Sequence, residues 1–170
     1  MGKVVQLPAL VRLRRALKRK GKVVVFTNGT FDILHRGHVE YLARAKRLGD
    51  VLAVGLNTDA SIRRIKGPGR PVNRAKDRAA VLAALQAVDF VCLFAEDTPG
   101  RIIARLKPDV LVKGADWKKD EIVGREIVES LGGKVRRIPL TPGRSTSRLI
   151  DRIVARSAVP RHAHSRGRRR

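Results

Sequence analysis

The sequence is poor in cysteine and aromatic residues, and it has no long apolar run. The single cysteine, Cys92, excludes an intramolecular disulfide and a metal site built from several cysteines. No stretch approaches the ~20 consecutive apolar residues that a transmembrane helix needs. Arginines interrupt the apolar residues of Leu7–Leu17, which is not the pattern of a signal peptide. We therefore expect a cytoplasmic protein.

Acidic residues are absent from both ends of the chain. The net charge is +23, yet residues 1–22 contribute eight Lys and Arg and residues 156–170 contribute six Arg, with no Asp or Glu in either segment. The body between them is also basic, which suits an anionic substrate, whereas the basic ends would attract any polyanion. An aromatic content of 4% is too low for rows of base-stacking side chains. Nucleic-acid binding through the termini is therefore the alternative and not the main expectation.

Buried apolar runs alternate with amphipathic segments along most of the 170 residues. The pattern predicts strands at 22–27, 51–56, 90–94, 109–113 and 134–138, and helices at 7–20, 38–48, 59–65, 74–87, from 98, at 124–131 and at 145–155. Such alternation builds a mostly parallel sheet with helices on both faces. We expect one Rossmann-like, doubly wound α/β domain with five strands at 22–156. An amphipathic helix would precede it in residues 1–21, and a disordered basic tail would follow at 157–170.

The segment TNGTFDILHRGH at 27–38 carries the chemistry. Gly29 and Gly37 let a ligand approach the backbone, and a helix N-terminus attracts phosphate. His35 and His38 can share one side of this helix start, where two imidazoles could stabilise a five-coordinate phosphorus. Nucleotidyl transfer needs little beyond such positioning and charge. The alternative is a pair of structural histidines. Zinc would need further ligands nearby, and neither a dinucleotide fingerprint nor a P-loop has this glycine spacing.

The stretch GTFDILHRGH resembles the GxFDxxHxGH signature of the cytidylyltransferase-like nucleotidyltransferases, and STSR at 145–148 resembles their second signature. The chain is also similar to the adenylyltransferase domain of bacterial heptose-phosphate enzymes. The matching stretches are FTNGTFDILHRGHVEYL, GLNTDASIRRIKGPGRPVN, AVDFVCLFAEDTP, PDVLVKGADW and GRSTSRLI, which together span about 22–155. In several bacteria that domain is fused to a sugar kinase. Because 170 residues leave no room for a kinase, the stand-alone form is expected.

The resemblance implies that the domain joins ATP and D-glycero-β-D-manno-heptose 1-phosphate into ADP-heptose, with release of pyrophosphate, for surface-glycan or lipopolysaccharide synthesis. Mg²⁺ would arrive with the triphosphate and need no dedicated protein ligands. Thr30 stands where Cys is frequent, and Trp117 where Tyr is common. Asp116-Trp117 is also similar to the glycerol-phosphate cytidylyltransferases, so transfer from CTP to glycerol 3-phosphate, or to another small phosphate, stays the alternative. If the protein forms a homodimer, the helix at 7–20 is the expected contact.

The resemblance also assigns roles to residues. His35, His38 and Lys66 would be catalytic. The nucleotide would contact Thr30, Phe31, Gly37, His38, Lys113, Gly114, Ser145, Thr146, Ser147 and Arg148, and the sugar phosphate would contact Asp32, Asn57, Arg78, Asp116 and Trp117. Several alternatives stay open.

Spacing alone favours a surface position for Lys66. Asp32 could orient or cap its turn, and Asp59 could simply cap a helix. Arg78 could lie along an apolar helix face. Trp117 could be edge packing, and Ser145–Ser147 could be a capping cluster without a ligand.

Overall fold

The computed structural model describes residues 1–157, so the predicted tail lies, apart from its first residue, outside the described residues. The strands are β1 (Lys3–Val4), β2 (Val24–Gly29), β3 (Val51–Asn57), β4 (Phe90–Phe94), β5 (Val110–Gly114) and β6 (Lys134–Ile138). The helices are α1 (Leu7–Arg19), α2 (Arg36–Lys46), α3 (Asp59–Lys66), α4 (Ala75–Ala84), α5 (Gly100–Leu106), α6 (Arg125–Ser130) and α7 (Thr146–Ser157), with a short 3₁₀ helix, η1 (Lys119–Glu121). None of the helices within 1–157 is long and apolar enough to cross a membrane.

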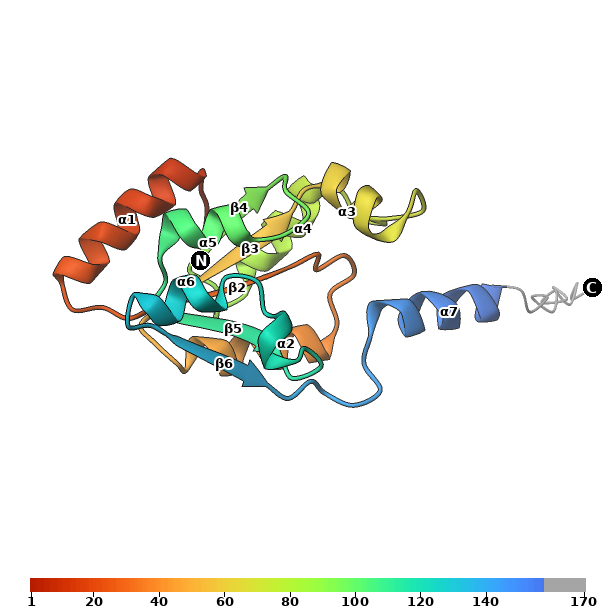
Figure 1. The fold of residues 1–170 in the computed structure, drawn as a ribbon. Helices are drawn as coiled ribbons and strands as arrows, with labels where there is room; N and C mark the ends of the chain where they lie inside the picture. The colour runs from red at the N-terminus through yellow and green to blue at the C-terminus, as the bar shows by residue number, and fades with distance from the viewer. Residues whose placement is uncertain (158–170) are drawn as a thin grey trace, which may run out of the picture.

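The strands form one parallel sheet in the order β1-β4-β3-β2-β5-β6 (Figure 1). This confirms the predicted α/β fold but corrects the strand number from five to six. The additional strand, β1, lies at the sheet edge, where Val5 N donates to the Val91 carbonyl at 2.9 Å. Two exposed residues are too few to show the periodicity that identifies a strand, so β1 could not be predicted from periodicity.

The sheet separates two hydrophobic cores because successive strand residues point to opposite faces. On one face Val25, Val54 and Val112 pack with residues of α2 and α4, including Leu42 and Leu82. The core of the other face combines residues of α1, α5 and α6 with residues of the strands. It includes Leu10, Phe26, Ala53, Ile102, Ile103, Leu106, Leu111 and Val128. The central strands β2, β3 and β5 are therefore buried on both sides, as their continuous apolar sequences predict.

Strand order reverses between β2 and β5. The chain places β3 and β4 on one side of β2, then crosses back to place β5 and β6 on the other. Val25 lies opposite Val110, so the carboxyl ends of β2 and β5 are neighbours. The connection after β2 and the connection after β5 run to opposite faces of the sheet. The crevice between them is where α/β sheets of this kind bind ligands.

Several helix starts differ from the expected ones. The second helix begins at Arg36, two residues early, with His35 as its N-cap residue. Thr58, not Asp59, caps α3, because its hydroxyl accepts from Ser61 N. Pro99 is the N-cap residue of α5, which begins only at Gly100.

The last helix, α7, does not close the domain as predicted. It projects away from the sheet and its helices, and none of its residues is buried (Figure 1). The helical periodicity of the segment was therefore interpreted correctly. Periodicity does not determine what an apolar face packs against, and that part of the prediction was wrong.

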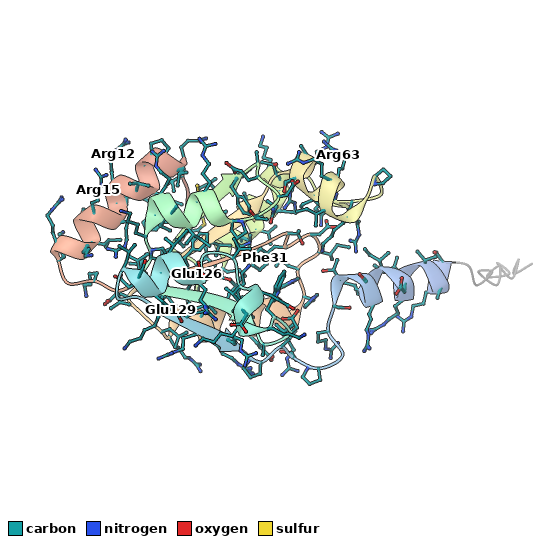
Figure 2. All side chains as sticks on the ribbon, in the orientation of Figure 1. Arg12, Arg15, Phe31, Arg63, Glu126 and Glu129 are labelled. Carbon is teal, nitrogen blue, oxygen red and sulfur yellow. The ribbon has the colours of Figure 1, made fainter. Side chains whose placement is uncertain are left out.

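Arg14 anchors α1 to the sheet. Its side chain is only 6% exposed, and Nη2 donates to Asp109 Oδ1 at 2.6 Å while Nε donates to the Lys107 carbonyl at 3.1 Å. The second oxygen of Asp109 accepts from Val24 N at 2.8 Å. Asp109 thus joins α1, β2 and the start of β5. The neighbouring Arg12 and Arg15 are exposed on the outer side of α1 (Figure 2).

We expect Asp109→Asn to lower the free energy of unfolding by about 2 kcal/mol, because it leaves the buried Arg14 guanidinium without its counter-charge. Urea unfolding followed by far-UV circular dichroism measures this. Glu129→Gln is the matched control, since Glu129 makes only exposed ion pairs with Lys119 and Arg125, and its loss should change stability by less than about 0.5 kcal/mol. Equal effects of both substitutions would contradict the anchoring role of Asp109.

Candidate functional site

A cavity of about 520 Å³ lies at the carboxyl ends of β2 and β5. Its walls are the loop after β2, the start of α2, the loop after β5 and the start of α7. The predicted residues in its lining are Thr30, Phe31, His35, Gly37, His38, Asn57, Lys66, Lys113, Gly114, Asp116, Trp117, Ser145, Thr146 and Ser147. Asp32, Arg78 and Arg148 are not in the lining.

The two histidines lie together at the start of α2. Their rings stack with centroids 3.9 Å apart and an interplanar angle of 17°. Both Nδ1 atoms are buried and, within residues 1–157, have no hydrogen-bond partner. A Cβ on Gly37 would lie 3.0 Å from the His35 ring, so glycine is what lets the ring cover the helix start. No side chain caps α2. Because His38 N already donates to the His35 carbonyl at 2.9 Å, the helix-start N–H groups left for a ligand are those of Arg36 and Gly37.

Both imidazoles are held toward the neutral form. Burial, with His35 and Lys66 nearby, lowers the pKa of His38 to about 4. Burial and Arg144 lower the pKa of His35, against the effect of its backbone hydrogen bond. Neutral imidazoles beside free helix N–H groups can donate to phosphate oxygens, and an arriving anion would favour their protonation.

Asp32 organises the loop at 67–74 rather than facing the cavity. Its oxygens accept from Arg70 Nη1 at 2.7 Å, Val72 N at 2.8 Å and Asn73 N at 3.0 Å, and the residue is buried. This geometry favours the orienting role among the alternatives.

Two cations from the α3 side reach the same region. Lys66 Nζ donates to Thr30 Oγ1 at 3.3 Å, and burial together with Arg70 lowers its pKa. Arg70 Nη2 also donates to Ser147 Oγ at 3.5 Å. The loop after β2, the loop at 67–74 and the start of α7 are therefore joined by hydrogen bonds across the cavity mouth.

Arg78 lies behind the cavity, with its side chain 1% exposed. Its donors go to the Thr30 carbonyl at 2.6 Å, Asp59 Oδ1 at 2.6 Å and the Asn73 carbonyl at 2.9 Å. Burial opposes the charge of Asp59, but the hydrogen bond from Arg78 prevails and lowers its pKa. Arg78 thus positions the backbone at Thr30, and all three nitrogens of its guanidinium already have protein acceptors.

The loop after β5 forms the opposite wall. Lys113 is 8% exposed, and its Nζ donates to Asn28 Oδ1 at 2.6 Å and lies 5.4 Å from the Trp117 ring centroid. Trp117 is 45% exposed, so it is not edge packing. A Cβ on Gly114 would overlap Asp116 Oδ1, so glycine is what lets this carboxylate fold back over the strand end.

At the start of α7, Ser145 Oγ accepts from Arg148 N at 3.2 Å, so Ser145 does cap the helix while it lines the cavity. Sequence reasoning missed Arg144, whose side chain lies in the lining where Arg148 was expected. It also missed Asn28 and Tyr41. Asn28 directly follows the buried run of β2, and Tyr41 lies one helical turn after His38, which are the signals that could have found them.

Comparisons with known proteins agree with this arrangement. Residues 26–156 match the model of the family described as cytidylyltransferase-like. The chain is 54% identical over 153 residues to the bifunctional protein HldE of Syntrophotalea carbinolica, and 55% identical over 149 residues to that of Campylobacter concisus. These alignments cover 86% and 87% of this chain but 31% of each relative, so the chain spans about a third of their length.

Among solved structures, the lipopolysaccharide core biosynthesis protein of Thermoplasma volcanium is 33% identical, with a TM-score of 0.59, over 71% of this chain and 98% of that one. The pantoate-β-alanine ligase of Francisella tularensis has a TM-score of 0.60 at 17% identity, over 86% of this chain and 69% of that one, and shares the fold alone. The chain belongs to the cytidylyltransferase-like family of nucleotidyltransferases. Within that family, it is similar to the HldE proteins.

The lowered pKa of His38 predicts a pH-dependent stability. As pH falls through about 6.5 the unfolded chain takes up a proton that the folded site takes up only near pH 4, so the unfolding free energy falls across this window. In the wild type, His38 should lower the free energy of unfolding by about 3 kcal/mol between pH 6.5 and pH 4. We expect His38→Gln to remove this part of the pH dependence. Urea unfolding at several pH values measures it. An unchanged pH slope in the variant, or a His38 NMR titration near 6.5, would refute the buried neutral state.

Proposed function

We propose that this domain transfers the adenylyl group of ATP to D-glycero-β-D-manno-heptose 1-phosphate, giving ADP-heptose and pyrophosphate. The observation that carries the proposal is the stacked His35–His38 pair, whose two residues line the cavity where α2 and α7 begin. The similarity to HldE proteins, and the sequence resemblance to the adenylyltransferase domain of heptose-phosphate enzymes, support the choice of substrates.

In this mechanism an oxygen of the sugar phosphate attacks the α-phosphorus of ATP. A new P–O bond forms while the bond from the α-phosphorus to the bridging oxygen breaks, and pyrophosphate leaves with that electron pair. The nucleophile is already an anion, so no base is required. His35 and His38 donate to oxygens whose charge increases, while Lys66, Arg144 and the N–H groups of two helix starts hold the triphosphate.

The triphosphate enters as its Mg²⁺ complex. Within residues 1–157 no three His, Cys, Asp or Glu side chains form a group that could hold a metal ion. Mg²⁺ keeps several waters and is commonly held by substrate phosphates with one or two carboxylates, so Asp116 in the lining is sufficient as a protein contact. We therefore treat MgATP as the substrate.

Pyrophosphate release tests the substrates directly. ATP, GTP and CTP are each paired with heptose 1-phosphate and with glycerol 3-phosphate. We expect release from ATP with heptose 1-phosphate to exceed every other pair. A preference for CTP with glycerol 3-phosphate would establish the alternative suggested by Asp116-Trp117.

His38→Ala should lower turnover by about 10²-fold or more, the usual cost of losing one transition-state donor, with the fold intact. Val39→Ala is the matched control, because Val39 is the exposed neighbour on α2 and lies outside the cavity lining. Circular dichroism checks folding, and pyrophosphate release measures the rate. A near-normal rate for His38→Ala would reject the assigned role.

We also propose that the protein pairs through α7 rather than through α1, whose Leu10 is already buried against its own body. Ile153 and Val154 are 55% and 60% exposed and form one side of α7 with Leu149 and Ile150. Ile153→Glu should convert a dimer to a monomer in size-exclusion chromatography with light scattering. Arg152→Glu changes charge without removing apolar surface and should leave the dimer intact. A monomeric wild-type chain would overturn the proposal.

A further inference from the structure

Lys113 is a buried cation without a carboxylate partner. It makes no ion pair within 4.0 Å among the described residues, and its one hydrogen bond goes to the neutral amide oxygen of Asn28. Burying an ammonium group without an anion is unfavourable, even with one amide acceptor. Two of its three N–H donors have no protein acceptor, and the residue lines the cavity. This wall therefore presents positive charge that no carboxylate within ion-pair distance neutralises among the described residues.

At the carboxyl ends of the strands, the Lys113 amine and the two histidines lie on opposite faces of the sheet. Side chains alternate along β2 and β5, so Asn28 and Lys113 share the face of Phe26 and Leu111, whereas Thr27 faces α2 and bonds Tyr41 at 2.7 Å. The contact of Lys113 with Asn28 thus spans β5 and β2 at the point where strand order reverses. A phosphate chain crossing the strand ends would meet the histidines on one side and Lys113 on the other.

We propose that Lys113, held in place by Asn28, is an anion receptor that binds a phosphate group of one of the two substrates. Asn28 acts as a positioning residue, because it keeps the amine at the strand end while leaving its charge unpaired. This deepens the proposed function, on which it rests for the identity of the substrates but not for the existence of the phosphate site.

The pKa of the Lys113 amine depends on its burial and on the charged groups around it. Burial lowers the pKa of Lys113 to about 8, and Asp116 opposes this by favouring the charged form. His38 and Tyr41 of α2 line the same cavity, and Arg137 is the register partner of Lys113 on β6. A bound phosphate favours the ammonium form and must raise its pKa. By linkage, phosphate affinity then falls as pH rises above about 8, by up to tenfold per pH unit.

Trp117 provides a readout that does not need turnover. It is the single tryptophan of the chain, and its ring lies 5.4 Å from the Lys113 amine. Emission of the full-length protein is titrated against pH, first alone and then with MgATP, heptose 1-phosphate or inorganic phosphate, each added separately. We expect a midpoint near pH 8 that the receptor's ligand moves upward. Comparing MgATP with heptose 1-phosphate identifies which substrate supplies the phosphate.

Variants test the same group. Lys113→Met should abolish this transition and weaken the responsible ligand at least tenfold, whereas Lys113→Arg should retain binding without pH dependence. Asn28→Ala should move the midpoint below that of the wild type, because the ammonium loses its acceptor. Lys134→Met is the matched control, since it removes the same charge at the amino end of β6, away from the carboxyl ends of the strands and outside the cavity lining.

The proposal is overturned if none of the three probes moves the midpoint, or if Lys113→Met binds all of them within twofold of wild type. Its failure is distinguishable from failure of the proposed function. Loss of pyrophosphate release with heptose 1-phosphate, combined with a phosphate-dependent Trp117 titration, would reject the substrate and keep the receptor. If Lys113→Met transfers the adenylyl group at the normal rate and binds every probe with unchanged affinity, the receptor is rejected and the proposed function is kept.

Discussion

Strands β2 and β5 come from different halves of the chain, yet they lie side by side at the centre of the sheet, and the site depends on that pairing. The loop after β2 carries the histidines on one face, and the end of β5 carries Lys113 on the other. Neither loop forms a cavity alone. The same pairing is stabilised from behind by Asp109, which bonds β2 and α1 at the opposite end of β5.

The cavity is built with more positive than negative groups. Lys66, Lys113 and Arg144 line it together with the carboxylates Asp97 and Asp116, and burial holds the two histidines toward neutrality. Such a site is electrostatically unfavourable when empty and gains most from a ligand that carries several negative charges. A nucleoside triphosphate with a sugar phosphate meets that condition, and a neutral ligand would not.

Much of this arrangement was predictable because it depends on local pattern. Buried runs identified five strands, and the histidine spacing placed both rings on one side of α2. What the sequence did not show depends on long-range contacts. Arg78 was expected either along an apolar face or at the sugar phosphate, but Thr30 and Asp59 come together around it only in the fold. Arg144 lines the cavity instead of Arg148, and its place depends on the path by which the chain enters α7, which local pattern does not contain. Helical periodicity likewise does not predict the direction in which α7 leaves the domain.

Because of Arg78, the residue that fixes the phosphate loop is not one of the residues that contact the ligand. It fixes the backbone of the phosphate loop from behind, out of reach of any ligand, while the surface that meets the ligand is made of other side chains. Substitutions on that surface can therefore alter which sugar or base is accepted while the reactive centre keeps its shape. A scaffold of this kind is suited to divergence, in which new acceptors evolve on an unchanged chemical step.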